Sequence, residues 1–253
     1  MTFADDQLTQ DDFLGGAIKI WQPKNGYRAA TDPVFLAAAV VAKSGQSVLE
    51  IGCGAGTALA CLCKRVPGLD AHGLEIQADY ADLARRNAAD NGFKYAVHDG
   101  DLLDLPEPIR ATAFDHVFIN PPFYDALASS APSDSGRDTA HRIGEARLED
   151  WIIVGLRRLK PRGYFTIIHR AERLADILGA LNGKTGDIRI LPLTSREGRM
   201  AGRVIVRARK GVGGALELLA PLILHQGLAH STDEDSFRTG VRKILRNIQP
   251  IVM

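Results

Sequence analysis

Short apolar runs alternate with amphipathic stretches along the first two thirds of this chain. Ser47–Ile51 is a run of strand-forming residues, the glycine-rich segment Gly52–Gly56 interrupts it, and Thr57–Lys64 carries apolar residues at helical spacing. Ala71–Glu75 predicts a second strand, and Gln77–Asn91 predicts a helix that ends in a left-handed cap. The order strand, turn, helix, strand, helix is typical of an α/β fold.

The same alternation continues downstream. It predicts strands over Lys94–His98, Phe114–Ile119 and Tyr164–Ile168, helices over Asp150–Leu159 and Glu172–Leu181, and a turn at Lys160–Gly163. Parallel neighbours in a sheet need helical crossovers, and these crossovers are right-handed. We therefore predict a doubly wound, mostly parallel α/β sheet.

The end of the chain follows another pattern. Asp187–Leu193 and Arg203–Arg209 read as two strands joined by a loop without a helix, which predicts an antiparallel hairpin at the edge of the sheet. Leu216–His225 is a further strand-like run. Thr232–Asn247 predicts a closing helix, with Thr232 and Asp235 in capping-box-like spacing.

The composition is that of one enlarged globular domain. The chain has 253 residues, of which 45% are apolar. No apolar run is long enough for a membrane helix, and the first residues are polar and acidic, so we expect a cytoplasmic protein with no membrane partner.

The charge is unevenly distributed along the chain. Residues 1–150 hold 13 Lys and Arg against 22 Asp and Glu, whereas residues 151–253 hold 18 against 8. A basic half can mark a nucleic-acid face, although scattered arginines can equally form a solvated surface. The candidate phosphate contacts are Arg196, Arg199, Arg203, Arg207, Arg209 and Lys210.

The three cysteines predict neither a disulfide nor a metal site. Cys53, Cys61 and Cys63 lie too close together for an easy bridge and lack the paired spacing of zinc ligands. We interpret them as small apolar fillers around the glycine turn and its helix, and we expect no metal.

A ligand site is predicted where the first three strands end. The glycine turn lets the backbone approach a ligand closely, and the next helix presents unpaired N–H groups. Glu75 can accept hydrogen bonds from both hydroxyls of a ribose, and Asp101 can meet an adenine amino group. A nicotinamide dinucleotide is the less favoured ligand, because the third glycine of Gly52–Gly56 comes one residue early for that pattern.

The tetrapeptide Asn120-Pro121-Pro122-Phe123 comes directly after the fourth strand. Together with Val48–Gly56, Glu75 and Asp101 it resembles the class I S-adenosylmethionine-dependent methyltransferases that modify exocyclic or amide nitrogens. This resemblance covers roughly residues 25–210. It implies a seven-stranded, Rossmann-like sheet whose last-paired strand is antiparallel, followed by a strand and helix appendage at the end of the chain.

Within that branch, three segments look like the bacterial tRNA1(Val) adenine-N6-methyltransferase family: Asn25–Asp32, Gly73–Gln77 and Leu159–Gly163. The resemblance implies an RNA partner, most readily tRNA. We divide the chain into an N-terminal segment (1–45) that packs on the active site, a methyltransferase domain (46–210) and an extension of the same domain (211–253). The oligomeric state stays open.

The resemblance also implies roles for individual residues. Glu50 and the turn would hold the methionine part of the cofactor, Glu75 its ribose and Asp101 its adenine. Arg28 and Asp32 would clamp the cofactor carboxylate or order the entrance, although both can equally form capping and surface pairs. The predicted cofactor residues are Arg28, Asp32, Glu50, Gly52, Cys53, Gly54, Glu75, Ile76, Asp101, Leu102 and Asn120.

The predicted catalytic residues are Asn120, Pro121 and Phe123. The Asn120 side-chain oxygen and the Pro121 carbonyl would each accept one N–H of the target amino group, and Phe123 would stack on the ring. The nitrogen attacks as an amine and loses its proton afterwards, so alignment and two acceptors suffice without a strong base.

Four functions remain open, and methylation of an RNA adenine is the favoured one. The same corner methylates glutamine amides in release factors, although that family usually carries an N-terminal helical domain. DNA adenine enzymes tend to add a recognition domain. A non-catalytic cofactor-binding or RNA-binding scaffold is the fourth reading. Residues 125–144 are predicted to form a lid that orders with substrate, from which His141 and Arg142 would reach RNA phosphate.

Overall fold

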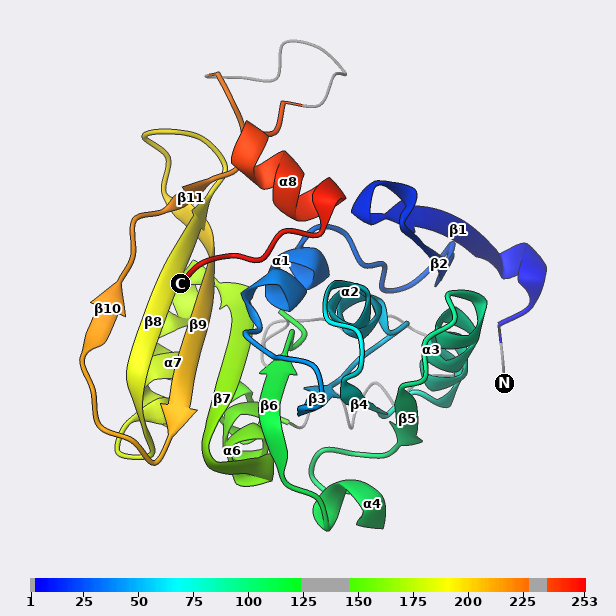
Figure 1. Ribbon diagram of the computed structural model, residues 1–253, viewed down its shortest axis with the longest axis horizontal. Helices are drawn as coiled ribbons and strands as arrows, with labels where there is room; N and C mark the ends of the chain where they lie inside the picture. Colours follow the sequence, from blue (N-terminus) through cyan, green and yellow to red (C-terminus); the bar gives the residue numbers. More distant parts are fainter. Residues whose placement is uncertain (1–2, 124–145, 228–235) are drawn as a thin grey trace, which may run out of the picture.

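A single mixed sheet of nine strands forms the centre of the molecule (Figure 1). The computed structural model describes residues 3–123, 146–227 and 236–253. The strand order is β10-β8-β9-β7-β6-β3-β4-β5, and β11 also pairs with β8. The strands are β3 (Ser47–Ile51), β4 (Asp70–Glu75), β5 (Ala96–Asp99), β6 (Phe114–Ile119), β7 (Leu159–Arg170), β8 (Thr185–Thr194), β9 (Ala201–Lys210), β10 (Leu216–Leu218) and β11 (Leu222–Ile223).

The seven strands from β3 to β9 have the predicted doubly wound arrangement. Strands β3 to β7 pair in parallel, because each pair is joined across a helix or a long connection. Strand β9 is antiparallel to both β7 and β8, since β8 and β9 form a hairpin. The class of fold and the reversed strand are therefore confirmed.

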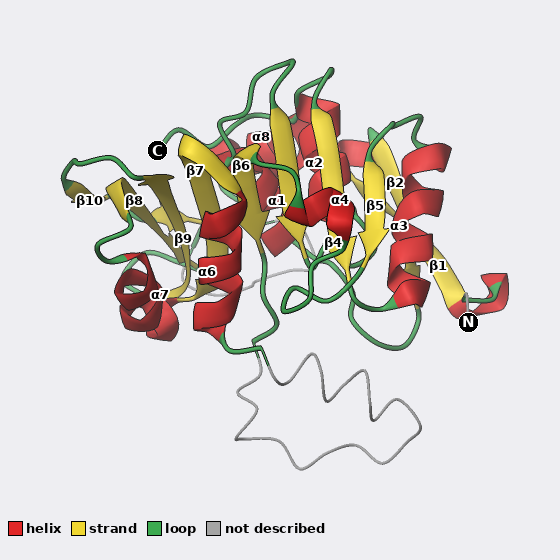
Figure 2. Cartoon of the chain, turned by 90° about the horizontal axis from the view of Figure 1, so that it is seen from below, coloured by secondary structure: helices red, strands yellow, loops and turns green. Residues whose placement is uncertain are grey.

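Helices cover both faces of the sheet (Figure 2). One apolar core joins α1, α2 and α8 to one face, and a second joins α6 and α7 to the other. The large buried side chains Phe35 and Phe118 belong to the first core, and Phe114 and Phe165 to the second. The helices are α1 (Asp32–Ala39), α2 (Thr57–Arg65), α3 (Ala78–Asp90), α4 (Glu107–Arg110), α6 (Leu148–Arg158), α7 (Leu174–Leu181) and α8 (Thr239–Asn247), with 3-10 turns at Asp5–Gln7, Leu14–Gly16 and Ala171–Arg173.

Two expected elements differ in detail. The run Leu216–His225 divides into β10 and β11, because the segment between them contains Pro221, which has no N–H to donate to a ladder. The turn expected at Lys160–Gly163 is an irregularity within β7 instead. There the register against β6 shifts and Arg162 has a positive φ of 65°.

The closing helix begins later than its sequence pattern suggests. Helix α8 starts at Thr239, and the preceding Ser236–Arg238 segment is not helical; its Phe237 forms an antiparallel bridge with His225. The expected capping box of Thr232 and Asp235 lies outside the described residues. In the described ranges, no helix is both long and apolar enough to cross a membrane.

An N-terminal hairpin was missed in the sequence. Strands β1 (Leu8–Phe13) and β2 (Ile18–Pro23) pair antiparallel, and β2 packs on α3. Ile18, Ile20 and Gln22 are buried on alternate positions, which is a recognisable strand signal.

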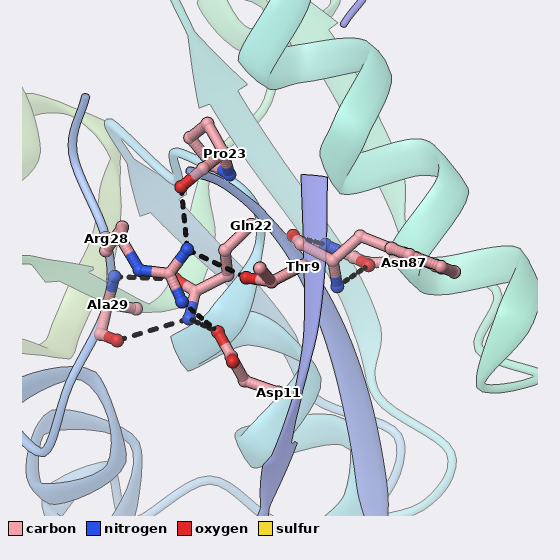
Figure 3. Close-up of polar contacts among 8 residues, drawn as sticks. Thr9, Asp11, Gln22, Pro23, Arg28, Ala29 and Asn87 are labelled. Atoms are coloured by element: carbon pink, nitrogen blue, oxygen red, sulfur yellow. Dashed lines mark hydrogen bonds and ion pairs between the residues drawn. The ribbon is translucent and has the colours of Figure 1, made fainter. Parts of the chain in front are cut away.

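Asn87 on α3 attaches this hairpin to the rest of the fold (Figure 3). Its side chain is fully buried, its Oδ1 accepts from the Trp21 N–H at 2.7 Å, and its Nδ2 donates to the carbonyl oxygens of Trp21 at 3.0 Å and Ala55 at 2.9 Å. One amide therefore joins β2, α3 and the glycine turn.

We predict that Asn87→Ala lowers the free energy of unfolding by at least about 2 kcal/mol, because it leaves a buried N–H and two carbonyls without partners. The matched control is Asn91→Ala at the C-cap of α3, which removes bonds to Lys19 N and O at exposed positions and one bond to the Asn87 carbonyl. We expect it to cost about 1 kcal/mol or less. Urea denaturation of both variants checks this, and equal losses would contradict it.

Candidate active site

The site lies where the parallel strands end at their carboxyl edge. Because β3 pairs with β6 and β4, the residues that follow these strands come side by side. Gly52 and Gly56 in the connecting turn have positive φ values of 71° and 78°. A Cβ at Gly52 would lie 2.6 Å from the Trp151 ring, and one at Gly56 would lie 2.7 Å from the Tyr95 hydroxyl. Glycine is required at both positions by conformation and by space.

Glu50 places a buried acid at the end of β3. The side chain is 3% exposed and its Oε2 has no hydrogen-bond partner among the described residues. Burial raises the pKa of Glu50 well above its usual range, and the charge of Glu75 raises it further, against the lowering effect of the Leu59 backbone. A cationic ligand would supply a partner for this oxygen and would favour the charged form of Glu50.

Glu75, at the end of β4, keeps capacity for further hydrogen bonds. Its two oxygens accept from the backbone N–H groups of Gly54 at 2.8 Å and Gln77 at 2.9 Å. Each carboxylate oxygen has a second lone pair, so both can still accept from hydroxyl groups. Asp101, which follows β5, accepts from the Leu103 N–H at 2.8 Å.

These residues line one cavity of about 640 Å³. Its size suits a nucleoside-sized ligand together with part of a second molecule. The structure brings the following predicted residues together in its wall: Glu50, Gly52, Cys53, Gly54, Glu75, Ile76, Asp101, Leu102, Asn120, Pro121 and Phe123.

Arg28 and Asp32 do not line this cavity. The Arg28 guanidinium donates to Thr9 Oγ1 at 2.8 Å, to the Pro23 carbonyl at 2.7 Å and to Asp11 at 2.6 Å, so it ties the hairpin to the segment that follows it (Figure 3). Asp32, in the first turn of α1, pairs with Arg203 at 2.9 Å. Asp32 therefore contacts the site indirectly, through its ion pair with Arg203.

Asn120 has one end of its amide held and the other end left open. Its Nδ2 donates to the Tyr27 hydroxyl at 3.3 Å, and its buried Oδ1 has no partner among the described residues. Tyr27 is itself fixed, because the Tyr80 hydroxyl donates to its carbonyl oxygen at 3.1 Å. Tyr27 as a whole residue is half-exposed, but removal of its hydroxyl from water, followed by the charges of Glu50 and Asp32, raises its pKa to about 12, so the hydroxyl stays protonated.

The Phe123 ring contacts a guanidinium group and an imidazole ring. The Arg203 guanidinium lies 4.4 Å from its ring centre, and the His169 ring meets it edge-on at a centroid distance of 5.2 Å. Burial lowers the pKa of His169 to about 4, and nearby Arg173, Arg203 and Arg170 contribute, so this imidazole is neutral at pH 7.

The basic residues predicted to contact phosphate do not form one patch. Arg207 is buried and donates to the Met253 carbonyl at 2.7 Å, whereas Lys210 donates to the Leu159 carbonyl. Arg196 is buried against the carbonyls of Gln226 and Gly227. Of the six, only Arg203 lines the cavity.

The cysteines are all free, with Cys53 and Cys61 buried, as expected of small apolar fillers. Within the ranges that the structure describes, no group of three or more His, Cys, Asp or Glu residues could hold a metal ion. The expected lid and its His141 and Arg142 lie outside those ranges.

The cavity residues that were missed in the sequence include Tyr27, Trp151, Arg170 and Gln22. The Asn25-Gly26 pair signalled a turn before Tyr27, yet no local pattern could show that this turn lies against β6. Trp151 and Arg170 occupy ordinary helix and strand-end positions, so only the tertiary fold identifies them.

The sheet order, the glycine turn and the three acids at successive strand ends are the features of the class I S-adenosylmethionine-dependent methyltransferase fold. S-adenosylmethionine carries an ammonium, a ribose and an adenine, and the acids at Glu50, Glu75 and Asp101 fit these groups. The profile of the methyltransferase small domain family matches residues 30–175, and the chain belongs to this family. The resemblance stated from the sequence is thereby confirmed.

Curated relatives agree on methyl transfer and differ in acceptor. A tRNA1(Val) (adenine(37)-N6)-methyltransferase of Porphyromonas gingivalis is 33% identical over 59% of this chain and 61% of its own length. Its Yersinia enterocolitica counterpart is 27% identical over 66% of this chain and 69% of its own length. A release factor glutamine methyltransferase of Geobacter sulfurreducens is 33% identical over 32% of this chain and 28% of its own length. The chain thus spans less than two thirds of the first relative.

Solved structures share the fold. A predicted O-methyltransferase from Agrobacterium tumefaciens has a TM-score of 0.67 at 24% identity, covering 87% of this chain and 98% of that one. A Thermus thermophilus 16S rRNA N2 methyltransferase, solved with AdoMet and guanosine, has a TM-score of 0.53 at 16% identity, covering 80% of this chain and 50% of that one.

We predict that Gly52→Ala weakens S-adenosylmethionine binding by roughly tenfold or more, because the new methyl group must displace Trp151 or the turn. Gly45→Ala is the matched control. Gly45 has a φ of 82°, but nothing lies within 4 Å of its Cβ position. It should lose about 1–2 kcal/mol of stability through backbone strain and keep its cofactor affinity. Isothermal titration checks both variants, and equal affinities would contradict the prediction.

Proposed function

We propose that this protein transfers the methyl group of S-adenosylmethionine to the exocyclic N6 amino group of an adenine in RNA, with tRNA as the favoured substrate. The observation that carries the proposal is the Asn120 amide. Its oxygen is buried and unpartnered among the described residues, and its nitrogen is held by Tyr27. A single acceptor held in this way suits an N–H donor entering the cavity.

The three acids at the carboxyl ends of the strands would hold the cofactor. Glu50 would receive its ammonium, Glu75 its ribose hydroxyls, and Asp101 its adenine amino group. Bound S-adenosylmethionine would supply an electrophilic methyl group. The glycine turn would let the backbone lie close to the ligand, with Gly52 and Gly54 in the positive-φ conformation that this approach needs.

Asn120, Pro121 and Phe123 would orient the target nitrogen. The Asn120 Oδ1 and the Pro121 carbonyl would accept its two N–H groups, which draws the lone pair out of conjugation with the ring. Phe123 would stack on the base. The nitrogen becomes cationic as the bond forms, and two fixed acceptors stabilise that charge without a strong base.

The choice of RNA rests on several supports. The two relatives with the broadest matches named above are tRNA adenine-N6 enzymes. An adenine in a single-stranded loop can be splayed out and stacked without opening a duplex. The proposal implies a cytoplasmic protein.

A glutamine amide in a release factor is the second candidate, because it is equally planar and a relative of that name matches 32% of the chain.

A transfer assay tests the proposal. The protein is incubated with labelled S-adenosylmethionine and, separately, with tRNA lacking modification, total protein and DNA, and the labelled nucleoside is then identified by mass spectrometry. We expect label in tRNA as N6-methyladenine. Label in protein alone, as methylglutamine, would contradict it.

We predict that Asn120→Ala lowers the rate of transfer by about 100-fold or more, because one of two acceptors for the developing charge is lost. Tyr27→Phe keeps the ring and removes the hydroxyl that orients the amide, so we expect a smaller loss, about tenfold. Cofactor affinity should stay within about twofold in both variants, which separates this effect from misfolding. Single-turnover kinetics measure the rates, and an Asn120→Ala enzyme with the normal rate would overturn the mechanism.

A further inference from the structure

The charged residues of the cavity are ordered along the sheet. Glu50 and Glu75 lie at the ends of β3 and β4, and Asp101 follows β5, all on one side of β6 and its Asn120. On the other side, the charged residues in the cavity wall are Arg170 at the end of β7 and Arg203 at the start of β9. The cavity is therefore acidic toward one end and basic toward the other, with the acceptor amide between them.

The two arginines lie directly opposite one another across an antiparallel pair. Arg170 and Arg203 are partners in the β7–β9 register. Like charges at such positions repel, since their Cβ atoms are only about 5 Å apart. Among the described residues each has one acidic partner: Glu172 lies 3.0 Å from Arg170, and Asp32 lies 2.9 Å from Arg203.

Arg203 retains donors for another ligand. Its Nε donates to Asp32 at 2.9 Å and its Nη1 to the Gly202 carbonyl at 3.1 Å, which uses two of five N–H groups among the described residues. Its side chain is 34% exposed, so the guanidinium is accessible. It also lies against Phe123, on which the target base would stack, so a base at that ring would come within reach of the guanidinium.

Resting on the proposed function, we propose that Arg170 and Arg203 form a phosphate subsite, which binds a backbone phosphate beside the target nucleotide. A nucleotide has a phosphate on each side of its sugar, whereas a glutamine side chain has no anion for two guanidinium groups to bind. The subsite therefore distinguishes the nucleic-acid acceptor from the protein amide that shares the Asn120 chemistry.

The chain offers a matched control. Arg209 lies on the same strand as Arg203, its guanidinium lies 4.9 Å from the Tyr164 ring centre, and it pairs with Asp187 at 3.9 Å. This arrangement repeats that of Arg203 with Phe123 and Asp32. Six residues of strand separate the two arginines by about 20 Å, and Arg209 does not line the cavity.

The first experiment measures transfer to an unmodified tRNA1(Val) transcript at several salt concentrations. We expect Arg203→Gln and Arg170→Gln each to raise KM for the transcript by roughly tenfold, and to reduce the slope of log affinity against log salt by about 0.7. Affinity for S-adenosylmethionine and the melting temperature should not change. Arg209→Gln should keep the normal KM and slope. Unchanged KM and slope in both Gln variants at the cavity would overturn the subsite.

The second experiment does not depend on methyl transfer. Adenosine, adenosine 5′-monophosphate and adenosine 3′-monophosphate are titrated into the protein saturated with S-adenosylhomocysteine. We expect at least one monophosphate to bind roughly tenfold more tightly than adenosine, and Arg203→Gln or Arg170→Gln to abolish that difference while Arg209→Gln keeps it. Equal binding of all three would overturn the subsite. A protein that methylates no RNA contradicts the proposed function instead, and the titration still decides the subsite.

Discussion

The site depends on two buried oxygen atoms without partners among the described residues, Glu50 Oε2 and Asn120 Oδ1, at the ends of neighbouring strands. Folding removes both from water, and a buried acceptor without a donor costs free energy of the order of 1–3 kcal/mol, more for a charged group. A fold retains such a cost where a ligand supplies the missing donor. A cofactor ammonium at Glu50 and a target N–H at Asn120 would each do so.

The remainder of the structure holds these two atoms in place. Two apolar cores fix the sheet from both faces, so β3 and β6 keep their register at the carboxyl edge. The N-terminal hairpin and the segment after it bring Tyr27 to Asn120, and Asn87 anchors that hairpin on α3. The strand order then separates the acids at the carboxyl ends of β3, β4 and β5 from the arginines of β7 and β9. Sheet topology thus determines the polarity of the cavity as well as its position.

Much of this could be predicted from the sequence because its signals are local. Strand β3, the glycine turn and the acid that ends β4 follow from short patterns, and β3 and β6 have the expected bounds. Contacts across the fold were not predictable in this way. Tyr27 meets Asn120 across 93 positions, and Arg203 meets Asp32 across 171. The basic half of the chain also suggested one RNA-binding patch, whereas the fold buries Arg207 and carries Arg209 to the far end of β9.

In the proposed mechanism Asn120 Oδ1 receives an N–H of the target nitrogen. A crystal structure of the protein with S-adenosylhomocysteine and an adenosine monophosphate would show this contact. We predict that the exocyclic amino group lies within about 3 Å of both Asn120 Oδ1 and the Pro121 carbonyl, with the base on Phe123. An adenine bound in this cavity with its amino group elsewhere, and with Asn120 Oδ1 paired to another donor, would exclude this role for Asn120.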